Sequence, residues 1–145
     1  MKLFTIGYEA ATQGAVIDCL TRAGVQVLVD VRAVASSRRA GFSKTLLAAS
    51  LAEAGVDYVH LRALGTPKAG RQAVRAGHPE QMHRIYEAHL AEPEAQLQLA
   101  ECAQIVAERR AALLCYEADA ANCHRRIVAG RLAEQLPLEI VDLTP

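Results

Sequence analysis

Short apolar runs and amphipathic stretches alternate along the whole of this 145-residue chain. The apolar runs lack a polar alternation, which is typical of strands that are buried on both faces of a parallel sheet. The stretches between them repeat apolar residues at helical spacing. Regular alternation of strands and helices favours a sheet whose two faces are covered by helices. We therefore expect an α/β protein with a three-layer sandwich, formed as a single domain over residues 1–145.

The expected sheet is mostly parallel and has about five strands. The apolar runs place these strands at residues 2–7, 27–31, 56–61, 112–116 and 138–143. The simplest arrangement for such a sheet is the strand order 3-2-1-4-5. A glycine- and proline-containing stretch at residues 65–77 is expected to be a long loop, of the kind that often carries function.

Capping signals predict five helices between these strands. Serine, threonine and asparagine favour the N-cap position, proline favours the first turn, and glycine favours the residue after a helix. Gly24 and Gly55 are accordingly expected to end the first two helices. The five helices are expected to begin at Thr12, Ser43, Pro79, Pro93 and Asn122, the last of them over residues 122–135.

Composition and charge narrow the class of protein. Sixteen basic and sixteen acidic residues cancel, so the molecule as a whole has no field that attracts nucleic acid. Tryptophan is absent and aromatic residues make up 4%, which argues against a base-stacking surface. No apolar run approaches the roughly 20 residues that cross a membrane, and the N-terminus lacks the features of a signal peptide. We therefore expect no membrane partner. The four cysteines lack CxxC spacing and the density of a secreted disulfide scaffold, so we expect a cytoplasmic protein.

Chemically active side chains follow three of the expected strands. Asp30 and Arg32 end the second strand, His60 ends the third, and Cys115 and Glu117 end the fourth. The carboxyl ends of parallel strands meet at one edge of a sheet, where ligands usually bind. We therefore expect these side chains to form a polar site at that edge.

The start of the last helix adds an expected anion site. With Asn122 as N-cap, Cys123, His124 and Arg125 occupy the first turn, whose free N–H groups and helix dipole attract anions. Arg125 and Arg32 can hold a phosphate or carboxylate with two hydrogen bonds each. The same environment lowers the pKa of a cysteine thiol, so a thiolate becomes available near neutral pH.

These features predict an enzyme or ligand-binding domain for a small anionic molecule that carries phosphate or carboxylate. The cofactor is left unknown, and the common nucleotide and serine-hydrolase motifs are missing. A structural interpretation stays open for each cysteine as a buried hydrophobe, for His60 as a core histidine and for Asp30 with Arg32 as an ion pair. The catalytic candidates are Cys115, Cys123, His124, His60 and Glu117, and the ligand-binding candidates are Asp30, Arg32, Arg125 and Asn122.

Two other classes of protein stay open. A transition-metal protein would use Cys115, Cys123, His124 and His60 as ligands. Adjacent residues on a helix diverge by roughly 100°, which makes a site shared by Cys123 and His124 awkward, and no metal ligand is assigned. The other class is a nucleic-acid-binding module, which the neutral net charge disfavours. The basic residues of such a module would be Arg32, Arg38, Arg39, Lys44, Lys68 and Arg71. The sequence leaves the oligomeric state open.

A series of motifs along the chain resembles domain-of-unknown-function family 488, a family of small prokaryotic proteins. The most specific motif is Cys115-Tyr116-Glu117 with Asp119, followed by Cys123-His124-Arg125. The family usually has a proline soon after its Asp-x-Arg motif, and this chain has Ala33-Val34-Ala35-Ser36 there, so we expect a more mobile loop. The resemblance implies importance, without roles, for Asp30, Arg32, His60, Cys115, Glu117, Cys123, His124 and Arg125. The other matching motifs are Thr5-Ile6-Gly7-Tyr8, Val29-Asp30-Val31-Arg32, Gly41-Phe42-Ser43-Lys44, Tyr58-Val59-His60-Leu61 and Leu64-Gly65-Thr66-Pro67-Lys68.

Overall fold

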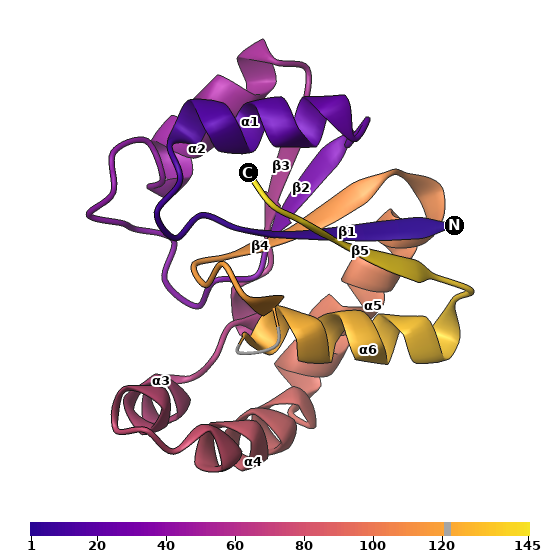
Figure 1. Cartoon of the computed structure of the whole chain (residues 1–145). Helices are drawn as coiled ribbons and strands as arrows, with labels where there is room; N and C mark the ends of the chain where they lie inside the picture. The colour runs from indigo at the N-terminus through magenta and orange to yellow at the C-terminus, as the bar shows by residue number, and fades with distance from the viewer. Residues whose placement is uncertain (121–122) are drawn as a thin grey trace.

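A parallel five-stranded sheet forms the middle layer of the protein (Figure 1). The computed structural model describes residues 1–120 and 123–145. The strands lie in the order β3-β2-β4-β1-β5, and every neighbouring pair is parallel. Their bounds are β1 (Lys2–Gly7), β2 (Val27–Asp30), β3 (Asp57–His60), β4 (Ala111–Cys115) and β5 (Glu139–Leu143).

Helices cover both faces of this sheet, which confirms the three-layer α/β sandwich. One apolar core lies between the sheet and α1 and α2, and a second lies between the opposite face and α5 and α6 and continues into buried residues of α4. Figure 1 shows α3 and α4 as a pair that lies away from the sheet. The helices of the described chain are α1 (Gln13–Arg22), α2 (Lys44–Glu53), α3 (Lys68–Arg75), α4 (Pro79–Leu90), α5 (Pro93–Glu108) and α6 (His124–Gln135), with a short 3-10 turn at Arg62–Leu64.

The local signals at the helix ends act as the sequence indicates. The Thr12 side chain accepts a hydrogen bond from the Ala15 N–H at 3.1 Å and so caps α1. Gly24 and Gly55 follow the first two helices with φ angles of +73° and +78°, in the left-handed region that favours glycine. Proline opens both α4 and α5. The predicted helix starts at Thr12, Ser43, Pro79 and Pro93 are therefore confirmed.

The expected strand order 3-2-1-4-5 is wrong, because β4 lies between β2 and β1 and pairs with both. All five residues of β4 are buried, which requires a strand on either side and a helix layer on either face. β5, by contrast, is mostly exposed and lies at one edge of the sheet. Burial thus places the most apolar strand at the centre, and chain order does not.

The expected long loop at residues 65–77 is also wrong in its centre, where α3 forms. Gly70 and Ala73 are the buried residues of this helix, and their small size allows it to pack closely on α4. An added Cβ at Gly70 would lie 2.6 Å from the Thr66 Cγ2 atom. Tertiary packing therefore forms a helix where glycine and proline made the local signal weak.

The start of the last helix differs from the prediction by a residue that matters for the site. α6 begins at His124, and Cys123 is its N-cap with extended backbone angles of φ −126° and ψ 144°. The N-cap is therefore not Asn122, and Asn122 itself lies outside the described residues. The sequence placed Cys123 in the first turn of this helix. In the structure Cys123 precedes the helix, so that prediction is wrong.

The topology places a crevice at the carboxyl end of β4. β1 and β2 lead into α1 and α2 on one face, whereas β4 lies between them and leads into α6 on the other face. Connections that leave neighbouring strands toward opposite faces open a crevice at the strand ends, and ligands bind there in sheets of this kind.

No helix in the described part of the chain is long and apolar enough to span a membrane.

Candidate functional site

A cavity of about 600 Å³ lies at this carboxyl edge. Four of the predicted catalytic and ligand-binding residues line it: Arg32 after β2, Glu117 after β4, and Cys123 and His124 at the start of α6. The volume is in the range of about 300–1,000 Å³ that is usual for small-molecule sites. The other lining residues are Tyr8, Ala33, Val34, Ser36, Thr66, Arg71, Val74, Arg75, Met82 and Tyr116.

Asp30 and Arg32 form a buried ion pair at the end of β2. The Arg32 Nη2 atom is 2.7 Å from the Asp30 Oδ2 atom, and its Nε atom is 2.9 Å from Oδ1. The Tyr58 hydroxyl also donates to Asp30, and Arg32 Nη1 donates to the Tyr8 hydroxyl and to the Phe42 carbonyl. Burial lowers the pKa of Arg32, but the hydrogen bonds and charge of Asp30 more than offset this and raise it above its ordinary value. The structure thus favours the ion-pair interpretation that the sequence left open.

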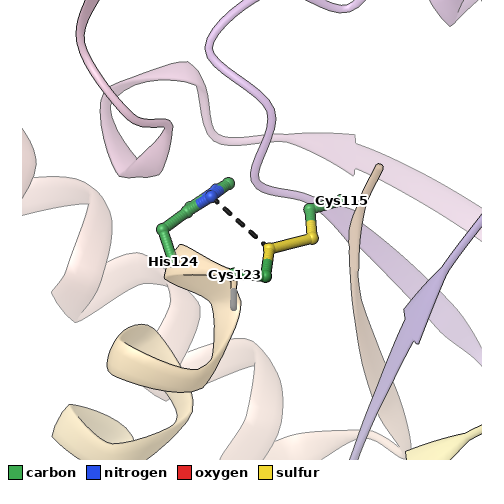
Figure 2. A group of neighbouring side chains, drawn as sticks. All are labelled: Cys115, Cys123 and His124. Atoms are coloured by element: carbon green, nitrogen blue, oxygen red, sulfur yellow. Dashed lines mark hydrogen bonds between the residues drawn. A yellow bond between two sulfur atoms is a disulfide. The ribbon is translucent and has the colours of Figure 1, made fainter. Parts of the chain in front are cut away.

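Cys115, Cys123 and His124 converge where the end of β4 meets the start of α6 (Figure 2). The two cysteine sulfurs form a disulfide, and the Cys123 Sγ atom is 3.6 Å from His124 Nδ1. On the other side of the ring, His124 Nε2 lies 2.7 Å from the Val31 carbonyl oxygen. Since a carbonyl oxygen only accepts, the proton of the neutral ring lies on Nε2 and the Nδ1 lone pair faces the sulfur.

Arg125 lies behind the cavity wall rather than in it. Its side chain is fully buried. Nη1 lies 2.9 Å from the Cys115 Sγ atom and also donates to the Glu117 carbonyl, while Nη2 donates to the Ala118 carbonyl at 3.2 Å. Burial lowers the pKa of this guanidinium, and nearby carboxylates act in the opposite direction. Arg125 therefore holds the loop after β4 in place and directs positive charge at a cysteine sulfur.

Burial also shifts the titration of two side chains that face the cavity. It lowers the pKa of His124 to about 4, although its hydrogen bond to Val31 acts in the opposite direction. His124 is therefore neutral at neutral pH. Burial raises the pKa of Glu117, and the charge of Arg125 reduces the shift. A carboxyl group with a raised pKa is a usual candidate for acid–base chemistry.

His60 is not brought to this cavity. Its Nε2 atom lies 2.7 Å from the Arg32 carbonyl oxygen, and its side chain lines a neighbouring hollow of about 540 Å³ together with Arg62 and His89. The burial of Arg32 also removes it from the basic surface that a nucleic-acid-binding module would need. The site as described therefore joins residues from β2, β4 and α6, and His60 lies outside it.

Two arginines of α3 that line the cavity were missed as ligand-binding candidates. The sequence suggested a role for Arg71 only in a basic surface that would bind nucleic acid, and it suggested no role for Arg75. They are four residues apart, so both lie on one face of α3. This spacing is visible in the sequence, but it had no meaning while residues 65–77 were expected to be a loop.

The two cysteines outside the site provide an internal reference for thiol reactivity. Burial raises the pKa of Cys102 in α5 to about 12, so we expect no alkylation of it at neutral pH until the protein unfolds. Peptide mass spectrometry after native alkylation measures this directly. Rapid labelling of Cys102 in the folded protein would contradict the packing described for α5.

The fold and the site together define a doubly wound α/β domain with a polar cavity at the carboxyl end of its central strand. The family model for the Domain of unknown function DUF488 matches residues 12–132, and the chain belongs to this family. The family that the sequence resembles is thereby confirmed. No curated protein and no solved structure matches the chain.

Proposed function

We propose that this domain binds a small molecule that carries phosphate or carboxylate, as substrate or as ligand, in the cavity at the carboxyl end of β4. The observation that carries the proposal is the presence of Arg71 and Arg75 on the cavity wall formed by α3. Guanidinium groups recognise phosphate and carboxylate oxygens through paired hydrogen bonds. We expect a cytoplasmic setting for this activity, in which the cysteines of the Cys115–Cys123 disulfide would be reduced to thiols.

The charges around the cavity support an anionic ligand. Arg32 is already neutralised by Asp30, so Arg71 and Arg75 supply the positive charge that is left for a ligand. Arg71 Nη1 donates to the Thr66 carbonyl at 3.1 Å, which restrains the position of the guanidinium. Glu117 is the acidic residue of this wall, and it suits a hydroxyl or amine elsewhere on the same molecule.

The remaining side chains of the site are suited to chemistry on the bound molecule. Neutral His124 and the carboxyl group of Glu117 can move protons. Once the disulfide between Cys115 and Cys123 is reduced, their thiols are candidates for a nucleophile or a redox pair. Arg125 would stabilise a thiolate at Cys115, because its Nη1 atom lies 2.9 Å from that sulfur. These catalytic roles stay predictions, whereas binding of the anion can be tested without knowledge of the reaction.

We expect the variant Arg71→Ala/Arg75→Ala to bind inorganic phosphate or pyrophosphate at least tenfold more weakly than the wild-type protein. A charge-assisted hydrogen bond contributes about 1.5–3 kcal/mol, and about 1.4 kcal/mol corresponds to tenfold in affinity. Isothermal titration calorimetry at constant ionic strength measures the change. Citrate in place of phosphate tests the carboxylate alternative.

Arg84→Ala is the matched control for this experiment. Arg84 is an exposed arginine of α4 that does not line the cavity, so its loss changes the net charge without touching the site. Equal affinity in the double variant and in the control would show that the cavity arginines do not hold the anion, and the proposal would then be rejected.

A further inference from the structure

We propose that Cys115, Cys123 and His124 form a Zn²⁺ site in the reduced protein, with one coordination position open to the cavity. The three-residue metal site stands independently of the anion proposal. Only the identity of the fourth ligand, the anion or a water molecule, rests on the proposed function.

The donor atoms are of the right type and lie close together. The two sulfurs and a ring nitrogen of His124 all lie within 4.8 Å of one another. Zinc binds thiolate sulfur at about 2.3 Å and imidazole nitrogen at about 2.0–2.1 Å, which places the ligand atoms of a tetrahedral site roughly 3.5–4 Å apart. The 3.6 Å distance between Cys123 Sγ and His124 Nδ1 agrees with that spacing.

The backbone at the start of α6 removes the objection that adjacent residues diverge. That objection assumes that Cys123 and His124 are both helical. Cys123 is instead the N-cap, with an extended backbone, and His124 is the first helical residue. The change of conformation between them directs the His124 ring at the Cys123 sulfur while that sulfur lies against Cys115, as Figure 2 shows.

The surroundings of the ligands are those of a metal site. A zinc-bound histidine usually donates its second ring N–H to a carbonyl or carboxylate, which orients the ring. His124 Nε2 makes this contact with the Val31 carbonyl oxygen at 2.7 Å, and Nδ1 is left to bind the metal. The Arg125 N–H group directed at Cys115 Sγ supplies the hydrogen bond that stabilises a coordinating thiolate.

The backbone spacing of the two cysteines suits a bridging ion. Their Cα atoms are 7.5 Å apart, whereas those of disulfide-bonded cysteines usually lie about 4.4–6.8 Å apart. Two thiolates on one zinc ion are separated by about 3.8 Å, nearly twice the length of a sulfur–sulfur bond, so they accommodate a wider backbone spacing. An added phosphine reduces the disulfide together with one water molecule: the phosphine supplies two electrons and takes the oxygen as phosphine oxide, and the two protons of the water complete the two thiols. Zinc then displaces their two protons.

Three protein ligands leave the fourth position of a tetrahedral ion free, as in catalytic zinc sites. Cys123 and His124 both line the cavity, so this position faces the space that Arg71 and Arg75 also line. Two thiolates neutralise the dication, and the arginines then supply the charge for an anionic fourth ligand. The zinc ion would polarise that ligand or activate a bound water molecule.

Metal binding is tested on the tag-free, phosphine-reduced full chain with Co²⁺ as a spectroscopic probe and with Zn²⁺. We expect one equivalent of Co²⁺ to give a sulfur-to-cobalt charge-transfer band, and Zn²⁺ to displace it. In the same samples, Zn²⁺ should slow alkylation of Cys115 and Cys123 at least tenfold, without changing Cys19 and Cys102, as read by peptide mass spectrometry. Cys115→Ser, Cys123→Ser and His124→Ala should each weaken Zn²⁺ binding at least tenfold, with Cys19→Ser as the matched control.

A reduced wild-type protein without the charge-transfer band, or without protection of Cys115 and Cys123, would overturn the metal site. Because both readouts use the wild-type chain, misfolding of a variant cannot obscure the result. Inorganic phosphate should shift the cobalt spectrum if the anion takes the fourth position. Calorimetric binding of phosphate without such a shift would overturn only the open-position part and leave the anion proposal intact. A metal site in a protein that binds neither phosphate nor citrate would reject the anion proposal alone.

Discussion

Replacement of Asp30 by alanine should lower the free energy of unfolding by about 3–5 kcal/mol, because it leaves the Arg32 guanidinium buried without its counter-ion. Asp30 is fully buried and Arg32 is 5% exposed, so water cannot replace the lost carboxylate. The substitution also removes the acceptor for the Tyr58 hydroxyl and for the Arg32 backbone N–H. Urea denaturation followed by circular dichroism measures the change.

Asp57→Ala provides the control for this prediction. Asp57 pairs with Arg109 at the same 2.7 Å distance, but the two side chains are 69% and 39% exposed. Such exposed pairs contribute about 0–1 kcal/mol. If Asp30→Ala lowers the free energy of unfolding no more than Asp57→Ala does, the buried ion pair does not stabilise the end of β2 as predicted. The double variant Asp30→Leu/Arg32→Met should recover part of the loss, since it removes both charges.

Gly7→Ala should destabilise the protein by about 3 kcal/mol, at the upper end of the range for overpacking a core. A Cβ atom at this position would lie 1.7 Å from the Glu117 carbonyl oxygen and 2.9 Å from Arg125 Nη1. Neither β1 nor the loop after β4 can accept this without a backbone shift. Because the same carbonyl accepts a hydrogen bond from Arg125, the shift would also disturb the arginine that contacts Cys115.

The control for Gly7→Ala is the same change at Gly14, in α1. An added Cβ at Gly14 meets no atom within 4 Å. Alanine is favoured over glycine in a helix, so Gly14→Ala should stabilise the protein by about 0.5–1 kcal/mol. Thermal denaturation of both variants measures the opposite signs. A Gly7→Ala protein as stable as the wild type would contradict the close approach of β1 to the Glu117 backbone.

The sequence predicts the layers of this fold well because they depend on local signals. Apolar runs identify the buried strands, and Thr12, Gly24 and the two helix-opening prolines set helix boundaries through backbone chemistry of a few residues. Strand order depends instead on which strand gains most from burial on both faces, and no short stretch of sequence encodes this gain. The position of β4 between β2 and β1 follows from competition among all five strands.

The candidate site was predicted where it depends on strand ends and missed where it depends on packing. Arg32, Glu117, Cys123 and His124 meet at one cavity because they follow β2 and β4 or begin α6, as the topology requires. His60 is the last residue of β3, but β3 is an edge strand and its end opens on the neighbouring hollow. Arg71 and Arg75 reach the cavity only because α3 packs against α4. The local sequence does not predict this contact.

The central position of β4 has a consequence for how the chain acquires its structure. β1 and β2 do not pair with one another, and both require residues 111–115 as their neighbour. During synthesis, the first hundred residues therefore emerge without the strand that joins the two halves of the sheet. Pairings between residues so distant in sequence make folding slow, and unpaired strand edges favour aggregation in the meantime. The same strand that carries Cys115 thus sets the moment at which the nascent polypeptide can close its sheet.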